Sequence, residues 1–317
     1  MSSATADLLT LKFVTLDVFT KTPYEGNPLA LVKIPSSVTV TQQQKQTIAR
    51  EFNLSETVFL HQQADPKTPE WKIDIFITTA ELPFAGHPTI GAAYYALSQW
   101  DGTGKEGGVL VTKSGRIAIT EREGGGGVVV EAKIAHNVHI HDHTFATLSR
   151  PLPWVSASEK IAEAERNASL VSIVKGMTFL LVELSSLEEL AAVKIGSVED
   201  GGFKGLLDQR DGWDAGFVGR YYFVVVGGGD AGTLSLRTRM LEVSFEDPAT
   251  GSAACSLASY LALSGRGGKF GIEQGVEMGR RSVIGVEVEV SGGGERKVES
   301  VKLSGSAVQV MEGSLRI

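Results

Sequence analysis

Two short stretches combine acidic, hydroxyl or imidazole side chains with a proline and the beginning of an apolar helix. The first, FEDPATGSAACSLASYLAL, begins at Phe245 and holds Asp247 and Ser252; the second, ELPFAGHPTIGAAYYAL, holds His87 directly before a proline. The beginning of a helix exposes backbone N–H groups that have no partner within the helix, and these groups attract anions. Each stretch is therefore typical of a site that binds a carboxylate beside a side chain able to exchange protons.

Glu56 is a third candidate, in the segment EFNLSETVFL at the junction of a loop and a predicted strand. Its neighbours Leu54, Val58 and Phe59 are apolar, so partial burial is expected to disfavour the charged carboxylate and raise its pKa toward neutrality. A carboxyl group with such a pKa both donates and accepts protons. The alternative is a surface glutamate at the start of a strand.

The other candidates also have structural explanations when each is taken singly. His87 and Ser252 would satisfy the first turn of a helix, and Asp247 would complement the helix dipole. Asp247 follows His87 by 160 positions (247 − 87), close to half of the 317 residues, which indicates two related halves of the chain. If the halves face each other, both helix beginnings point into one cleft, and an anion is bound from both sides.

Both halves have the pattern of strands followed by a helix of small residues. In the first half, strands are expected in LKFVTLDVFT, LALVKI, ETVFL and WKIDIFI, and helices after a Thr41–Gln44 capping box and in PTIGAAYYALSQW. In the second, MTFLLVEL, YYFVVVG and LSLRTRML read as strands and TGSAACSLASYLAL as a helix, before successive antiparallel strands from VIGVEVEV to SLRI. The glycine run at 124–127 is the predicted boundary, which gives domains of residues 1–127 and 128–317.

Charge and apolar patterning exclude several classes of protein. The 30 basic and 37 acidic residues give a net charge of −7 with no run of Lys or Arg, which argues against nucleic acid as a partner. No apolar stretch reaches the roughly 18–20 residues of a membrane span, so no membrane role is expected. The beginning MSSATADLLTLKF lacks a basic region before an apolar core, and a cytoplasmic location is therefore expected.

Cys255 is the single cysteine, so no disulfide forms within the chain and a reducing compartment is expected. A racemase that uses two opposed thiols cannot be built from this sequence. A mechanism with one nucleophilic thiol is formally open. Because Cys255 lies within the apolar helix pattern, an inert buried residue is the favoured interpretation.

Motifs for metals and nucleotides are weak. The stretch NVHIHDH places His139, His141 and His143 on one face of a strand, a spacing that would suit a metal. No cluster of carboxylates or cysteines clearly joins them, so an exposed polar strand is expected and no metal is predicted. The glycine runs at 124–127 and 227–229 lack a dinucleotide fingerprint, and no P-loop, HExxH or GxSxG motif occurs.

Five blocks, in this order, resemble the PhzF family of phenazine-biosynthesis-like proteins. They are DVFTKTPYEGNPLALV, AREFNLSETVFL, IFITTAELPFAGHPTIGAAYYAL, EDPATGSAACSLASYL and EQGVEMGRRSVIGVEV, and they run along nearly the whole chain. The chain departs from the family pattern in FITT before ELPF, in MLEVSF between Arg239 and Glu246, and in MGRRS. These departures leave the shape of the pocket near Leu241–Phe245 open.

The resemblance implies an α+β fold of the diaminopimelate epimerase type. Two pseudo-symmetric domains are expected, each a mostly antiparallel sheet or barrel wrapped around a central helix, with the last strand, about residues 306–317, joining the first domain. The resemblance also implies a homodimer, an active site in the cleft between the domains, and no cofactor. The family chemistry is the isomerisation of trans-2,3-dihydro-3-hydroxyanthranilate, in which a proton moves within the substrate.

Site residues follow from the resemblance motif by motif. It implies that Glu56 shuttles the proton as acid and base, and that His87 and Asp247 are further catalytic groups. The residues implied to bind the substrate are Ser252, Gly86, Gly251 and Asn27.

The resulting prediction is a cofactor-independent isomerase of the PhzF type that acts on a small carboxylate-bearing substrate. The alternative is a member of the same fold that binds metabolites or partner proteins without catalysis, although a pure binder need not retain Glu56. A racemase or epimerase is disfavoured because the chain has no second thiol.

Overall fold

The computed structural model describes most of the chain, and it divides into two compact units. The described residues are 9–63, 68–98, 106–123, 127–144, 146, 156, 158–195, 205–214, 216–228, 232–242, 244–292 and 296–317. Unit 1 comprises residues 1–132 and 306–317, and unit 2 comprises residues 133–305. The glycines at 124–126, expected at the domain boundary, lie outside the described residues.

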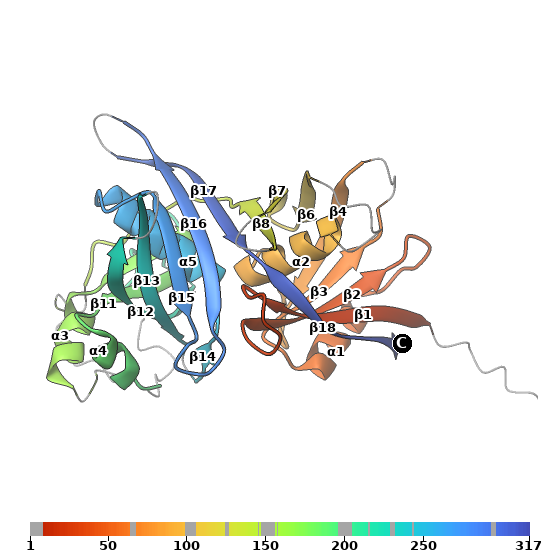
Figure 1. The fold of residues 1–317 in the computed structure, drawn as a ribbon, viewed down its shortest axis with the longest axis horizontal. Helices are drawn as coiled ribbons and strands as arrows, with labels where there is room; N and C mark the ends of the chain where they lie inside the picture. Colours follow the sequence, from red (N-terminus) through yellow and green to blue (C-terminus); the bar gives the residue numbers. More distant parts are fainter. Residues whose placement is uncertain are drawn as a thin grey trace, which may run out of the picture. The chain divides into compact units, whose positions relative to one another are not determined.

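Unit 1 is a mostly antiparallel sheet whose strands come from both ends of the chain. β1 lies between β2 and β18, antiparallel to both, and the C-terminal strand β18 runs along the whole of β1 (Figure 1). β2 and β3 are parallel, β3 and β4 antiparallel, and β4 pairs with both the short β5 and the parallel β6, which continues into β7 and β8. The strands are β1 (Thr10–Val18), β2 (Asn27–Ile34), β3 (Thr57–His61), β4 (Glu70–Phe76), β5 (Glu81–Leu82), β6 (Gly107–Thr112), β7 (Gly115–Glu123), β8 (Val128–Lys133) and β18 (Ala307–Arg316).

Unit 2 repeats this order of pairings. β10 lies beside β9 and β11, β11 and β12 are parallel, β12 and β13 antiparallel, and β13 pairs with the short β14 and the parallel β15. β15, β16 and β17 follow as antiparallel neighbours. The strands are β9 (His139–Ile140), β10 (Ser169–Val174), β11 (Met177–Glu183), β12 (Phe217–Gly228), β13 (Thr233–Leu241), β14 (Glu246–Asp247), β15 (Lys269–Gln274), β16 (Ser282–Val290) and β17 (Val298–Gly305).

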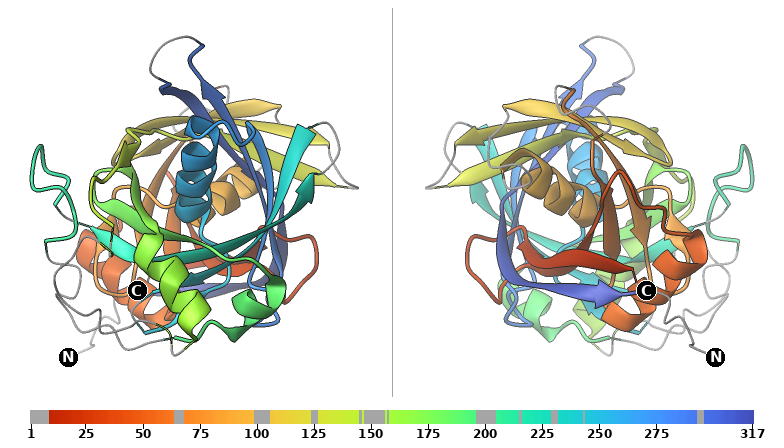
Figure 2. Two further views of the ribbon diagram at one scale, coloured as in Figure 1. Left: turned by 90° about the vertical axis from the view of Figure 1, so that its left-hand side faces the viewer. Right: turned by 90° about the vertical axis from the view of Figure 1, so that its right-hand side faces the viewer.

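A buried helix occupies the same place in both units. In unit 1, α2 (Gly86–Ser98) contacts strands β1 to β4, β6, β7 and β18, and in unit 2, α5 (Gly251–Leu263) contacts β10, β11 and β15 to β17. Nearly every residue of both helices is buried, so each is apolar on all sides. Figure 2 shows α5 with strands of unit 2 around it. The predicted α+β class, a sheet wrapped around a central helix, is confirmed.

Shorter helices cover the outer face of each sheet. In unit 1, α1 (Gln42–Phe52) packs Ile48 onto Phe59 and Phe76 of the sheet. In unit 2, α3 (Glu159–Asn167) and α4 (Leu187–Ala192) pack onto β11 and β12 through a second apolar cluster. The predicted capping box is present, because Thr41 accepts from the backbone of Gln44 while the Gln44 side chain accepts from the Thr41 backbone. None of the described helices is long and apolar enough to cross a membrane.

The repeat corrects the pairing expected between the halves. β5 and α2 begin at Glu81 and Gly86, and β14 and α5 begin at Glu246 and Gly251, so the offset is 165 positions (246 − 81) and not 160. His87 therefore corresponds to Ser252 and not to Asp247. The counterparts around the two helix beginnings, unit 1 first, are Leu82 and Asp247, Ala85 and Thr250, Gly86 and Gly251, and His87 and Ser252.

Candidate active site

Glu56 immediately precedes β3, where the chain leaves α1. The helix ends at Asn53 in the left-handed conformation (φ 51°), and three residues later the Glu56 side chain is largely buried, with 17% of its surface exposed. Burial raises the pKa of Glu56 to about 7, and a hydrogen bond with Ser55 lowers this pKa only in part. Near neutral pH the carboxyl group therefore exists in both protonation states, as an acid/base group requires.

His87 brings an imidazole to within reach of this carboxyl group. It is the second residue of α2, its side chain is 3% exposed, and its Nδ1 lies 3.6 Å from Glu56 Oε2. The same Nδ1 lies 3.5 Å from Nδ2 of Asn27, which is also buried. A separation of 3.6 Å is too long for a hydrogen bond, but catalytic contacts are often loose before substrate binds. The structure therefore brings together three of the residues that the sequence singled out.

Asn27 is held in place by a braced loop between β1 and β2. Gly26 has a φ of +67°, and a Cβ there would lie 2.3 Å from the carbonyl oxygen of Val18. Tyr24 has a φ of 71°, and its backbone N–H donates to Asp17 Oδ2 at 2.6 Å. Left-handed backbone at a residue other than glycine costs free energy and is typical of functional loops. The glycine of the GNP motif is thus needed for the turn that delivers Asn27.

Unit 2 contributes a separate polar set around Asp247, the second residue of β14. Asp247 is 8% exposed, and its Oδ2 accepts a hydrogen bond from the Thr250 hydroxyl at 2.5 Å. Gly251 and Ser252 are the first two residues of α5, and both are buried. The backbone N–H groups of this first turn have no acceptor within the helix and can donate to an anion. Sequence reasoning identified Asp247, Gly251 and Ser252 but missed Thr250.

The two sets offer complementary chemistry. Glu56 and His87 in unit 1 are suited to moving a proton, because one has a pKa near 7 and the other is an imidazole beside it. Asp247 and the beginning of α5 in unit 2 are suited to holding charged groups of a ligand, an amine at the carboxylate and a carboxylate at the helix.

An ion pair joins Arg239 and Glu246, the two residues that flank the segment MLEVSF. Arg239 donates from Nε and Nη2 to the two carboxylate oxygens of Glu246, at 2.8 and 2.7 Å. Its Nη1 donates to backbone carbonyl oxygens of α4 and the residue after it, including those of Leu190 and Val193. Glu246 stands directly before Asp247, so this pair fixes the strand that carries the acid.

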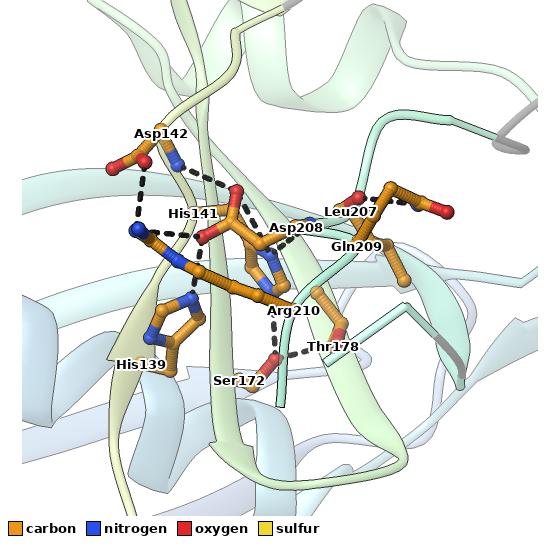
Figure 3. A network of polar contacts seen from close by, with 9 residues as sticks. All are labelled: His139, His141, Asp142, Ser172, Thr178, Leu207, Asp208, Gln209 and Arg210. Atoms are coloured by element: carbon orange, nitrogen blue, oxygen red, sulfur yellow. Dashed lines mark hydrogen bonds and ion pairs between the residues drawn. The ribbon is translucent and has the colours of Figure 1, made fainter. Parts of the chain in front are cut away.

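Two of the three histidines considered as metal ligands, His139 and His141, belong to a hydrogen-bonded network with Asp208 (Figure 3). His139, His141 and Asp208 bring their ligand atoms within 4.8 Å of one another. His141 Nδ1 accepts from the Asp208 backbone N–H at 3.0 Å, and its Nε2 contacts Ser172 Oγ at 2.9 Å. Burial lowers the pKa of His141 to about 4, so the ring is neutral and both of its nitrogens are engaged.

The same network contains a cation. Arg210 Nη2 lies 3.9 Å from Asp208 Oδ2 and donates to Asp142 at 2.9 Å. A guanidinium group beside the Asp208 carboxylate disfavours binding of a second positive charge there. The hydrogen bonds of the cluster connect the 205–214 loop to β9 and β10. The expectation of an exposed polar strand was wrong for His141, which is 5% exposed.

Cys255 is inert, as expected. It lies in the third position after Ser252 in α5, is fully buried, and burial raises the pKa of its thiol far above the usual range. A thiolate at this position is therefore strongly disfavoured at neutral pH.

Fold and site together define a two-unit α+β protein with a carboxylic acid of near-neutral pKa beside a histidine. The family model described as "Phenazine biosynthesis-like protein" (PhzC-PhzF) matches residues 16–313. The chain therefore belongs to the PhzC-PhzF family, which confirms the resemblance inferred from the five motif blocks.

Individual relatives agree with this assignment. The chain is 31% identical to an uncharacterized isomerase of Mesorhizobium japonicum, over 97% of this chain and 99% of the relative. It is 30% identical to the trans-2,3-dihydro-3-hydroxyanthranilate isomerase of Pseudomonas chlororaphis, over 96% and 98%. The predicted enzyme class, an isomerase, is confirmed at the level of the family.

Solved structures show the same fold. A PhzF family protein of Bacillus anthracis matches with a TM-score of 0.76 at 20% identity, covering 98% of this chain and all of the other. A probable proline racemase of Agrobacterium radiobacter matches with a TM-score of 0.62 at 13% identity, covering 96% and 92%. At these identities the likeness concerns the fold alone, and both solved structures share the α+β fold of this chain.

Proposed function

We propose that the chain is a cofactor-independent isomerase that moves a proton within trans-2,3-dihydro-3-hydroxyanthranilate or a closely related cyclic amino-carboxylate. The observation that carries this proposal is the raised pKa of Glu56, about 7, beside the Nδ1 atom of His87. The relative from Pseudomonas chlororaphis, which is named for this reaction, supports the choice of substrate. We further expect a homodimer and a cytoplasmic location.

Glu56 performs the chemistry in this proposal. Its ionised carboxylate accepts a proton from one carbon of the substrate, and the electron pair of that C–H bond shifts the adjacent double bond. The protonated Glu56 then returns the proton to a second carbon, so the product has the same composition as the substrate. A pKa near 7 makes both half-reactions accessible at neutral pH, because neither protonation state is costly to reach.

The remaining residues bind and orient the substrate. His87 stands next to Glu56 and assists proton transfer, while Asn27 fixes the imidazole by its contact with Nδ1. The first turns of α2 and α5, at Gly86 and Gly251, donate backbone N–H groups to the substrate carboxylate. Asp247 receives the amine or hydroxyl group of the substrate, and Ser252 donates to its carboxylate.

A direct test compares the wild type with Glu56→Gln, which keeps the shape of the side chain and removes its titratable proton. The wild type should convert trans-2,3-dihydro-3-hydroxyanthranilate, and the variant should lose about 10²–10⁴-fold in kcat. Glu51→Gln, at an exposed glutamate of α1, is the matched control and should retain wild-type turnover. Binding of the substrate by the wild type without turnover would favour the alternative, a non-catalytic metabolite-binding protein.

Participation of both units in one reaction is part of the proposal and has its own test. Glu56→Gln and Asp247→Asn are combined, and kcat is compared with that of each single variant. Residues that act on one substrate give strongly non-additive losses, whereas independent sites give additive ones. Additive losses would contradict a shared active site.

A further inference from the structure

Gln274, the last residue of β15, lies at the centre of a buried hydrogen-bond network in unit 2. Its side chain is 0% exposed. Its Oε1 accepts from the Tyr221 hydroxyl at 3.0 Å and from the Thr250 backbone N–H at 3.2 Å. Its Nε2 donates to the Asp247 carbonyl oxygen at 2.8 Å and to Thr250 Oγ1 at 3.1 Å. All four hydrogen-bonding positions of the amide are therefore used.

The direction of each hydrogen bond follows from the groups that can only donate or only accept. The backbone N–H of Thr250 only donates, so the amide oxygen of Gln274 must face it and the amide nitrogen must face Thr250 Oγ1. Because the Thr250 hydroxyl accepts this N–H, its single proton is available for Asp247 Oδ2, which lies 2.5 Å away. The chain of hydrogen bonds therefore runs from Tyr221 through Gln274 and Thr250 to the carboxylate of Asp247.

The internal repeat shows that the fold does not require this network. β13 pairs with β15 as β4 pairs with β6, so Gln274 corresponds to Thr112, the last residue of β6. In unit 1 the hydroxyl of Thr112 binds locally, to Ser114 and to the carbonyl oxygen of Gly115. The counterparts of the other three members of the network are apolar: Leu82 for Asp247, Ala85 for Thr250 and Val58 for Tyr221. The network exists only where the acid is present.

We propose that Gln274 and Thr250 are positioning residues, which hold the Asp247 carboxylate in one orientation and favour its ionised form. The role of Asp247 rests on the function proposed above, whereas the network itself rests on the geometry of unit 2. A carboxylate that accepts an O–H donor is stabilised relative to the carboxylic acid, so loss of the donor makes Asp247 easier to protonate. Loss of the donor also removes a contact that holds the orientation of the side chain.

Titratable and charged groups of unit 2 also lie near Asp247 among the described residues. Tyr221 and Cys255 both have pKa values raised by burial far above their usual range, so they stay neutral at physiological pH. Arg239 on β13 and Glu246 on β14 form an ion pair with each other. The hydroxyl of Thr250 donates directly to the Asp247 carboxylate, so its removal should change the state of Asp247.

The test removes the hydroxyl while keeping the side-chain shape. Thr250→Val should move the titration midpoint of Asp247, followed by NMR on protein with ¹³C-labelled aspartate carboxyl groups, upward by about one to two pH units. Thr250→Ser, which restores a hydroxyl, should return the midpoint to within about half a unit of the wild type. Gln274→Met should give a smaller upward shift, because it removes the donor to Thr250 and leaves the hydroxyl in place.

A matched control distinguishes positioning from general disturbance of the core. Thr178 is also completely buried in unit 2, and its hydroxyl contacts Ser172 and not Asp247. Thr178→Val should leave the Asp247 titration unchanged. An equal shift in this control, or no shift in a folded Thr250→Val protein, would overturn the proposal. Thr250→Ala gives the same readout if the valine variant does not fold.

Kinetics give a second readout that separates this proposal from the proposed function. With trans-2,3-dihydro-3-hydroxyanthranilate, Thr250→Val should lower kcat/KM by about 10- to 100-fold and displace its pH profile, with rescue by Thr250→Ser. If the wild type does not turn this compound over, the proposed substrate is wrong. The NMR titration still decides whether Thr250 controls the state of Asp247.

Discussion

The two units share one order of strand pairings but carry different polar groups at equivalent positions. In unit 1 Glu56 precedes β3; its counterpart in unit 2, one residue before Arg220 in the matching register, is Gly219. A Cβ at Gly219 would lie 2.6 Å from the carbonyl oxygen of Leu241, so unit 2 has no room for a side chain there. Asp247 in unit 2 has Leu82 as its counterpart.

The comparison shows that the two units repeat the same arrangement of strands and helix but not the same set of polar side chains. Each copy places a helix beginning after a short strand, and both beginnings are suited to anions. Glu56 and His87, the residues proposed to transfer the proton, lie in unit 1, and the buried hydrogen-bond network around Asp247 lies in unit 2. Because the counterpart of Glu56 is Gly219 and the counterpart of Asp247 is Leu82, neither unit alone holds both of these acids.

Among substitutions that compare counterparts in the two units, the largest effect is expected from the pair His87 and Ser252. Under the proposed function, His87→Gln should lower kcat/KM by about 10²–10³-fold, because the imidazole assists proton transfer. Ser252→Ala should cost only about 10-fold and act mainly on KM, since one hydrogen bond to the substrate is lost. Steady-state kinetics on trans-2,3-dihydro-3-hydroxyanthranilate measures both. A larger loss for Ser252→Ala would reverse the assignment of roles to the two units.

The second effect concerns pH and activity together. Glu56 must be ionised to accept the first proton, so kcat/KM of the wild type should rise with pH through about 7. Measurement of the rate between pH 5 and 9 locates this limb. A rise centred near the usual pKa of glutamate, about 4.3, would show that the buried carboxyl group is not the one that limits the reaction.

The third effect is on stability, and its sign follows from the raised pKa. Folding favours protonated Glu56, whose pKa is raised to about 7 from the usual 4.5, so stability is lost as pH rises from 4.5 through 7. Glu56→Gln should therefore be more stable than the wild type at pH 8, by up to about 3 kcal/mol, and equal to it near pH 4.5. Denaturant unfolding at the two pH values measures this difference. Glu51→Gln should show no such dependence.

The smallest effects are expected from two equivalent loops, the β1–β2 loop of unit 1 and the β10–β11 turn of unit 2. Gly26→Ala should destabilise by about 1–3 kcal/mol or more, because the backbone is left-handed and the added Cβ meets the Val18 carbonyl oxygen. Gly176, in the β10–β11 turn, is also left-handed (φ +85°) but has open space around it. Gly176→Ala should cost only about 1 kcal/mol. Thermal unfolding of both variants checks the order.

Much of the local structure was predictable from the sequence. The capping box at Thr41 and Gln44, the small-residue helices and the alternating strands follow from short-range rules, and the structure contains them. Helix α3 was not predicted, since its only large buried apolar residue is Ile161 and most of its other side chains are polar. Its position depends on Glu165, which is buried against the Tyr222 hydroxyl at 2.6 Å.

The sequence predicted which residues form the candidate site but not how far apart their atoms lie. Asn27, Glu56 and His87 lie in separate motifs, and nothing in their spacing gives the 3.5 and 3.6 Å separations at Nδ1 of His87. Gln274 lies in the block EQGVEMGRRSVIGVEV, but the sequence does not indicate its partner Tyr221, because a glutamine at the end of one strand and a tyrosine within another meet only through pairing of distant strands. The offset of 165 likewise needed the register of the strands.

By itself, the sequence determined the elements, the family and the identities of the candidate acids, because these depend on short-range patterning and on motifs along the chain. Only the tertiary structure decided which carboxyl group is buried enough to titrate near neutral pH and which is held by a hydroxyl donor. The physical reason is that desolvation and hydrogen bonding depend on atoms far apart in the chain, which folding alone brings into contact.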